Sequence, residues 1–141
     1  MKKSKIPIVL TIAGSDSGSG AGIQADLKTF SSLGVYGTTA ITVVTSQNTK
    51  GVRDVSVLDL SMISSQIDCL VEDFDLRAIK TGMLFTPDIV KIVSDKAKEY
   101  KWEKLIVDPV MVSESGDSLL EDDAINSYVK DLIPISILVR S

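Results

Sequence analysis

Short apolar stretches alternate with single amphipathic stretches along this chain. The first apolar stretch, 8–13, is almost unbroken, which is typical of a strand buried on both faces, as in parallel sheets. The next stretch, 23–33, has its apolar residues at helical spacing. Because one helix between two strands joins parallel neighbours, the pattern predicts an α/β layered sheet. The predicted strands are 8–13, 39–45, 78–80, 105–107 and 135–139, and the predicted helices are 23–33, 62–74, one starting at 86–88, and 122–132.

The bulk composition fits one domain. The chain has 141 residues, of which 44% are hydrophobic and 24% charged, and no linker or repeat interrupts it. We therefore expect a single domain over 1–141. No run approaches the roughly 18 apolar residues that a membrane span needs. The basic start, 1–5, leads into a predicted buried strand without a cleavage pattern, so we expect no signal peptide and a cytoplasmic location.

Charge and residue types exclude several functions for these residues. The net charge is −4 and no basic stretch is interleaved with aromatic residues, which argues against nucleic acid as a partner. Histidine is absent, which excludes Ser-His-Asp and Cys-His catalysis and His-ligated metals here. The only cysteine, Cys69, lies in an apolar helical stretch, so we expect a buried small side chain.

Polar and glycine-rich segments follow four of the predicted strands. In open parallel sheets, ligands bind in the crevice beyond the carboxyl ends of the strands. The four segments therefore predict one binding site at this edge of the sheet. They are residues 14–22, 47–48, 81–83 and 108–116.

The glycine-rich segment 14–22 has two interpretations. Backbone N–H groups at a helix start can bind a phosphate, but neither a Gly-x-Gly-x-x-Gly motif nor a P-loop can be drawn through these glycines. A tight connection that needs positive φ explains the glycines equally well. The missing motifs disfavour other doubly wound nucleotide-binding proteins.

The individual polar residues also leave alternatives open. Asp16 either belongs to a site or caps the following helix, and Asp26 is either a site residue or a solvated acid. Gln47 is a turn residue or an amide that recognises a ring edge, since a primary amide both donates and accepts. Met83 fills the core unless the end of its strand lines a pocket, and Asp108 begins a pair with proline that can simply end a strand.

Taken together, these segments resemble the hydroxymethylpyrimidine/phosphomethylpyrimidine kinases, a family of the ribokinase-like superfamily. The resemblance runs in order from about Ile8 to Val139. The residues that carry it are 11–16, 20–30, 33–37, 40–42, 47–49, 82–84, 107–111, 115–117 and 119–120.

The resemblance implies a three-layer ribokinase-like fold, with a mostly parallel sheet and helices on both faces. It implies phosphorylation of 4-amino-5-hydroxymethyl-2-methylpyrimidine, and then of its monophosphate, with ATP and Mg²⁺ in thiamine biosynthesis. Gln47 matches the residue that recognises the pyrimidine edge. Apolar walls and one amide suit such a ring, because the walls exclude water and the amide sets its orientation. The implied substrate-binding residues are Gly14, Asp16, Asp26, Gln47, Met83 and Val110.

The sequence also departs from the family pattern. Thr81 stands where relatives commonly carry isoleucine, and Glu114 stands where they commonly carry lysine. Relatives continue past the strand equivalent to 135–139 into a second half with the ATP-binding elements and the catalytic base. We therefore expect no catalytic residue and no metal ligand in this chain, and a sheet truncated after about five strands.

Two functions are consistent with this pattern. The first is the N-terminal, substrate-binding half of the kinase. The alternative is a free-standing half that binds a pyrimidine, or complements a C-terminal half, without kinase activity. An unpaired last strand favours association, so a homodimer or a complementing half is an expected partner. Neither the preferred phosphorylation step nor acceptance of pyridoxal-type substrates follows from the sequence.

Overall fold

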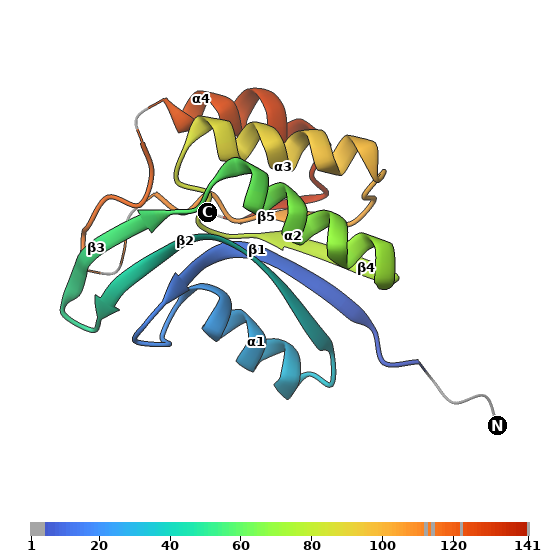
Figure 1. The fold of residues 1–141 in the computed structure, drawn as a ribbon, viewed down its shortest axis with the longest axis horizontal. Coiled ribbons are helices and arrows are strands. Elements are labelled where there is room, and N and C mark those ends of the chain that lie inside the picture. The colour runs from blue at the N-terminus through green and yellow to red at the C-terminus, as the bar shows by residue number, and fades with distance from the viewer. Residues whose placement is uncertain (1–4, 112, 114, 122, 141) are drawn as a thin grey trace.

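The computed structural model describes residues 5–111, 113, 115–121 and 123–140, which form three layers (Figure 1). Helix α1 (Gly22–Ser32) lies on one face of a sheet. Helices α2 (Leu60–Asp73), α3 (Pro87–Glu99) and α4 (Ala124–Ser127) lie on the other face. The predicted layered α/β fold, with helices on both faces of the sheet, is confirmed.

Within the described residues the sheet has six strands, in the order β3-β2-β1-β4-β5-β6. All neighbours pair in parallel except β2 and β3. The chain moves outward from β1 to β2 and then returns to β4 on the other side of β1, so the strand order reverses there. The strands are β1 (Ile8–Asp16), β2 (Tyr36–Asn48), β3 (Gly51–Val57), β4 (Leu76–Thr81), β5 (Leu105–Val107) and β6 (Leu138–Val139).

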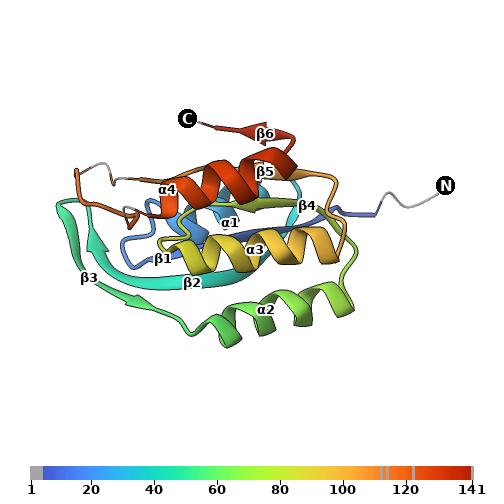
Figure 2. The same cartoon turned by 90° about the horizontal axis from the view of Figure 1, so that it is seen from above.

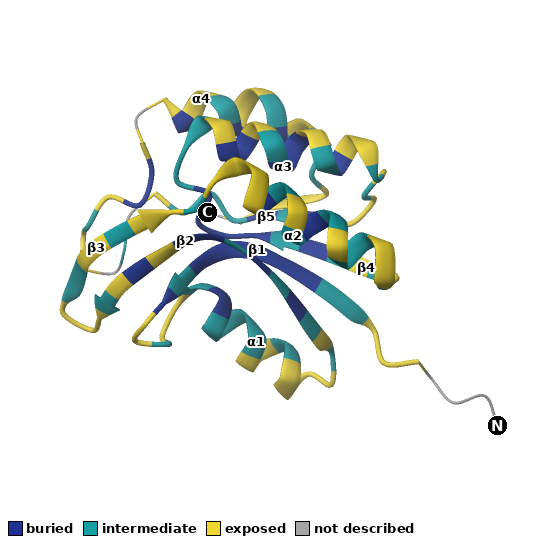
Figure 3. Cartoon of the chain, viewed as in Figure 1, coloured by how far each residue is buried: buried dark blue, intermediate teal, exposed yellow. Residues whose placement is uncertain are grey.

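The main core lies between the sheet and the layer of α2 and α3 (Figure 3). Leu10 of β1, Ile67 of α2 and Val93 of α3 are each fully buried in it. Burial of one such side chain contributes about 1.5–3 kcal/mol. This core holds β1 and β4 rigidly, and their carboxyl ends position the site.

The start of α3 follows its sequence pattern. The Thr86 hydroxyl accepts a hydrogen bond from the Ile89 N–H at 3.2 Å, and Pro87 occupies the first turn. Asp88 lies in that turn, where the helix dipole favours an acid. No described helix is long and apolar enough to cross a bilayer.

The segment after residue 45 differs from the prediction. Instead of a polar loop, β2 continues to Asn48 and turns back as the antiparallel strand β3, so the sheet has six strands in the described residues rather than about five. The Asn48 side chain accepts from the Lys50 N–H at 2.9 Å, which stabilises the turn. Val52 and Val55 of β3 are half-buried while Arg53, Asp54 and Ser56 are exposed, as expected of an edge strand with one open face.

The end of the described chain is also less regular than predicted. Helix α4 continues as a π-helical turn (Tyr128–Leu132) and a 3₁₀ turn (Ile133–Ile135). Pro134 favours this interruption because it lacks an N–H. The predicted strand 135–139 is reduced to β6, at the edge of the sheet opposite β3 (Figure 2). The predicted helix start at Asp122 lies outside the described residues.

Cys69 is exposed, so the expectation of a buried cysteine was wrong. Ile63 and Ile67 form the buried face of α2. Cys69 follows Ile67 by two positions, about 200° around the helix, and therefore points away from the core.

We predict that Thr81→Val raises the free energy of unfolding by about 1 kcal/mol, because it removes a buried hydroxyl that has no partner. Thr81 is fully buried, and its Oγ1 atom makes no hydrogen bond with the described residues. The matched control is Thr42→Val. Thr42 is also fully buried, but its hydroxyl donates to the Met83 carbonyl at 2.7 Å, so that variant should be less stable. Urea unfolding measures both changes in the free energy of unfolding, and a change in the same direction in both variants would contradict the prediction.

A polar cluster joins α2 to α3. The Asp68 Oδ1 atom accepts from the Lys96 ammonium at 2.6 Å and from the Tyr100 hydroxyl at 2.5 Å. The hydrogen bond from Lys96 has the largest effect and that from Tyr100 adds to it. Together they hold the pKa of Asp68 below its ordinary 3.8. The same carboxylate raises the pKa of Tyr100 to about 12.

We predict that Asp68→Asn lowers the free energy of unfolding by about 1 kcal/mol at pH 7. A lowered pKa in the folded state gives stability that is present above the unfolded value, about pH 4, and is lost as the pH falls through the folded pKa. The gap between parent and variant should therefore close in acid. Asp75→Asn is the control, because the Asp75 side chain is 87% exposed and lies 3.8 Å from Arg77. An undiminished difference in stability between parent and Asp68→Asn at pH 2 would show that the ionised carboxylate is not its cause.

Candidate functional site

A cavity of about 480 Å³ lies at the carboxyl ends of β1, β2 and β4, where the strand order reverses. It collects residues from all four polar segments of the sequence. Every predicted substrate-binding residue lines it, namely Gly14, Asp16, Asp26, Gln47, Met83 and Val110.

Asp16 organises the turn between β1 and α1. Its carboxylate accepts from the N–H groups of Gly18 at 2.8 Å, Gly20 at 3.0 Å and Ala21 at 2.9 Å. The side chain therefore does not cap the helix in the usual way, since the N-cap residue is Ala21. Both carboxylate oxygens already have partners, so Asp16 shapes the cavity wall.

Glycines allow this turn to fold tightly against the strand. Gly22 has φ +62°, and a Cβ there would lie 2.4 Å from the Gly14 carbonyl oxygen. A Cβ on Gly14 would in turn lie 2.9 Å from Val43. The Gln24 side chain spans the turn, accepting from the Asp16 N–H at 2.9 Å and donating to Ser15 at 2.8 Å. The glycines of this segment thus have a demonstrated structural role.

Asp26 is not a solvated acid. Its Oδ2 atom accepts from the Thr11 hydroxyl at 2.6 Å and from the Lys80 ammonium at 2.9 Å. The Asp26 and Lys80 side chains are only 19% and 24% exposed, and both line the cavity. This ion pair joins α1 to β4 at the cavity floor.

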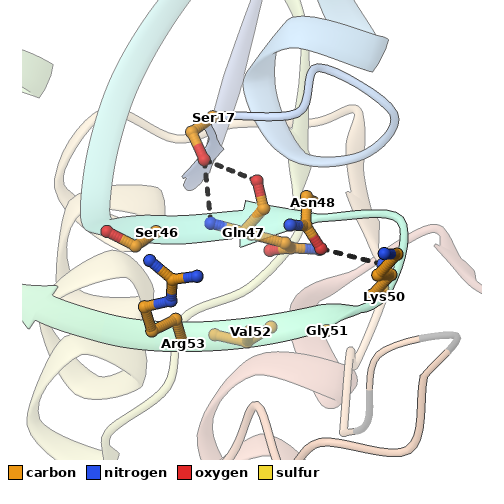
Figure 4. A pocket seen from close by; sticks show the side chains of 8 residues that line it. All are labelled: Ser17, Ser46, Gln47, Asn48, Lys50, Gly51, Val52 and Arg53. Atoms are coloured by element: carbon orange, nitrogen blue, oxygen red, sulfur yellow. Dashed lines mark hydrogen bonds between the residues drawn. The ribbon is translucent and has the colours of Figure 1, made fainter.

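Gln47 is fixed through its backbone rather than its side chain. The Ser17 hydroxyl donates to the Gln47 carbonyl at 2.6 Å and accepts from the Gln47 N–H at 2.8 Å (Figure 4). The Thr45 hydroxyl lies 3.2 Å from Gln47 Oε1, but its single hydrogen has the shorter contact, 2.8 Å, with the Ser15 carbonyl. The Gln47 amide therefore keeps donors and an acceptor for a ligand.

The apolar walls of the cavity belong to a second, smaller core. Met83 and Leu119 pack with Val43, and Val110 packs against this cluster. A Cβ on Gly14 would lie 3.3 Å from the Met83 sulfur, so the glycine lets the methionine approach the strand. The result is an apolar wall, called the slot below, that lines the same cavity as the Gln47 amide.

Asp117, which the sequence did not indicate as a site residue, holds the segment after β5 against the hairpin. The Asp117 carboxylate accepts from the Val52 N–H at 2.9 Å and from the Ser115 hydroxyl at 2.9 Å. The hydrogen bond from the Val52 N–H is the main cause that holds the pKa of the Asp117 carboxylate below its ordinary value. Val52 pairs directly with Gln47 across the hairpin. Glu114, one of the two residues that depart from the family pattern, lies outside the described residues.

A second hollow, also about 480 Å³, lies on the hairpin beside Gln47 (Figure 4). The Arg53 side chain reaches across it from β3 toward β2. No buried residue lines this hollow, whereas Gly14, Asp16 and Met83 are buried walls of the first cavity. The first cavity is therefore the better ligand site.

The described residues do not offer a ready-made metal site. No three acidic, cysteine or histidine side chains among them are grouped closely enough to hold an ion. Asp16 and Asp26 both line the cavity, but each already binds protein donors. Mg²⁺, which the resemblance implies, thus has no evident ligand set in this part of the chain.

Sequence comparison identifies the family. The family model described as phosphomethylpyrimidine kinase matches residues 16–140. The chain belongs to the phosphomethylpyrimidine kinase family. The hydroxymethylpyrimidine/phosphomethylpyrimidine kinase of Bacillus subtilis is 51% identical over 90% of this chain and 47% of its own length. The corresponding kinase of Rhizobium meliloti is 46% identical over 94% of this chain and 49% of its own length. The chain thus spans about half the length of these curated relatives.

Solved structures of similar kinases have the same fold. Phosphomethylpyrimidine kinase from Clostridium difficile is 50% identical, with a TM-score of 0.88 over 96% of this chain and 58% of that one. Pyridoxal kinase from Staphylococcus aureus, solved with AMP-PCP and pyridoxal, is 34% identical, with a TM-score of 0.83 over 96% of this chain and 48% of that one. The predicted ribokinase-like arrangement is confirmed for the part that aligns.

We predict that Gly22→Ala lowers the free energy of unfolding by more than about 2 kcal/mol, because it adds a steric clash to an unfavourable backbone conformation. The control is Gly34→Ala. Gly34 also has positive φ, +71°, but a Cβ there meets no atom within 4 Å. That variant should lose about 1 kcal/mol from backbone strain alone. Urea unfolding compares the two, and equal losses would show that contact with the Gly14 carbonyl is unimportant.

Proposed function

We propose that this chain is the N-terminal, substrate-binding half of a kinase that phosphorylates 4-amino-5-hydroxymethyl-2-methylpyrimidine and then its monophosphate. The supporting observation is the Gln47 amide, held by its backbone beside the slot of Met83 and Val110. We further propose that residues 1–141 act as one domain. The continuity of the main core from β1 to the turns after α4 supports this.

The chemistry of the slot suits an aminopyrimidine. Its flat ring fits between Met83 and Val110, which exclude water. The side-chain Oε1 of Gln47 can accept from the 4-amino group while the side-chain amide N–H donates to the neighbouring ring nitrogen. A ring that lacks either group leaves one side of the amide unpaired, which costs binding free energy.

Phosphoryl transfer needs more than this slot. It depends on positioning and on groups that stabilise charge on the transferring phosphoryl group. We propose that ATP, Mg²⁺ and the catalytic base are held by the portion of the longer kinases that this chain does not span. The residues described here would bind and orient the acceptor alcohol.

A second candidate function is complementation or self-association without independent activity. The observation that favours it is the exposed apolar edge of the sheet. Ile137 is 61% exposed, Leu138 57% and Val139 40%. An uncovered edge strand is a template for pairing with another polypeptide or a second copy. Such a chain would bind the pyrimidine but would need a partner for turnover.

We predict saturable binding of hydroxymethylpyrimidine to the chain in isothermal titration, and a loss of at least about tenfold in affinity in Gln47→Ala, from the unpaired ring edge. The control is Gln66→Ala. The Gln66 amide bonds only the Ile41 backbone, at 2.8 and 2.9 Å, away from the cavity. That variant should lose stability without losing ligand affinity.

Two further measurements in the same experiment separate the candidates. Turnover with ATP and Mg²⁺ by the chain alone would contradict the proposed division of labour, whereas binding without turnover supports it. Pyridoxal as a competing ligand tests selectivity, because its ring edge differs from that of the aminopyrimidine. Absence of pyrimidine binding by the folded chain would overturn the proposed function.

A further inference from the structure

The ion pair at the cavity floor is built from three elements. Thr11 of β1 and Lys80 of β4 are direct neighbours in the sheet. Asp26 reaches them from α1, and its Oδ2 atom accepts from Thr11 at 2.6 Å and from Lys80 at 2.9 Å. Two donors from a rigid sheet thus fix one oxygen of a helix carboxylate.

A simple role as a staple between helix and sheet does not account for the position of this pair. The chain has another close, partly buried pair, Lys96 with Asp68 at 2.6 Å, which joins α2 to α3. Neither of those residues lines the cavity, whereas Lys80 and Asp26 both do. Of these two ion pairs, Lys96–Asp68 therefore only joins two helices, whereas Lys80–Asp26 also lines the cavity.

Gly82 leaves room for the Lys80 side chain. A Cβ on Gly82 would lie 2.9 Å from Lys80 Nζ and 2.9 Å from the Ala13 side chain. Any other residue at this position would push against the ammonium group from the cavity side. The glycine after β4 is thus matched to a lysine that crosses the cavity floor.

The hydrogen bonds around Asp26 leave one acceptor free for a ligand. Both protein donors go to Oδ2, and no described residue donates a hydrogen bond to Oδ1. An ionised carboxylate only accepts hydrogen bonds, so its partner on the ligand must be a donor. If Gln47 pairs with the ring nitrogen and one 4-amino N–H, the donors left on the substrate are the second 4-amino N–H and the hydroxymethyl O–H, and only the O–H is lost when the hydroxyl is removed.

We propose that Lys80, together with Thr11, is a positioning residue that holds the Asp26 carboxylate so that Oδ1 accepts a hydrogen bond from the substrate's hydroxymethyl group. The inference rests on the proposed function. Asp26 touches the substrate, and Lys80 and Thr11 act through it. The pair thereby distinguishes an alcohol from a ring that lacks the hydroxyl, and it holds the alcohol oxygen in one direction.

The test is isothermal titration with two ligands, hydroxymethylpyrimidine and 4-amino-2,5-dimethylpyrimidine, which lacks only the hydroxyl. Lys80→Met should weaken binding of the alcohol about tenfold and of the dimethyl ring less than about twofold, because only the alcohol uses Asp26. Lys80→Arg should restore most of the lost affinity, since it returns a cation to Asp26. Asp26→Asn combined with Lys80→Met should be no worse than the more damaging single change.

Two matched variants separate this role from a loss of folding. Lys96→Met removes the comparable pair between α2 and α3 and should leave both affinities unchanged. Thr11→Val has nearly the same shape as the parent and removes one donor to Asp26, so it should weaken the alcohol selectively even if Lys80→Met fails to fold. Circular dichroism and urea unfolding establish that each variant is native before titration.

The outcomes are distinguishable. Equal weakening of both ligands in Lys80→Met or Thr11→Val would overturn the positioning role while leaving the pyrimidine assignment intact. An equal effect of Lys96→Met would show that the loss reflects stability and would also overturn it. If the parent binds neither ligand, the proposed function itself fails.

Discussion

The site depends on one tight turn, in which the buried Asp16 carboxylate accepts hydrogen bonds from backbone N–H groups that have no partner within a helix or strand. Asp16 accepts three N–H groups between β1 and α1, and only a glycine at 22 fits against the Gly14 carbonyl. This turn sets where α1 begins and how closely it packs on the sheet. Asp26, in the second turn of α1, is thereby placed within hydrogen-bonding distance of Lys80. A loosened turn would move the cavity wall and the cavity floor together.

The two apolar clusters have different tasks. The large cluster under α2 and α3 stabilises the fold and contains no part of the cavity. Met83 and Leu119 of the small cluster, which pack with Val43, line the slot, and the Val52 N–H bond to Asp117 holds the hairpin and the later segment together. Separation of this kind lets a substitution in the ligand slot leave the main core undisturbed, because packing changes are felt locally.

Periodicity predicted most of the fold because the parallel strands and their helices are buried on one or two faces. It failed at β3, where a half-exposed hairpin strand resembles a polar loop, and at Cys69, where the apolar composition of the helical stretch was taken to indicate a buried side chain. The six predicted site residues do share a cavity. Lys80 could have been found from its place beside Gly82, but the pairing of Lys80 with Asp26 spans 54 residues and needs the strand register to reveal it.

The charges that line the cavity also fit a site that binds the acceptor, rather than one that stabilises the negative charge of the transferring phosphoryl group. Both oxygens of Asp16 are occupied by backbone donors and Lys80 compensates Asp26, while Asp108 and Arg140 add one charge of each sign to the lining. The alcohol, the first of the two proposed substrates, is neutral and therefore enters such a site without a large desolvation penalty of its own. Stabilising a transferring phosphoryl group requires the opposite, an excess of fixed donors and cations. Recognition of the acceptor and stabilisation of the phosphoryl group are therefore best served by separate parts of a kinase, and the cavity at β1, β2 and β4 has the properties expected of the first.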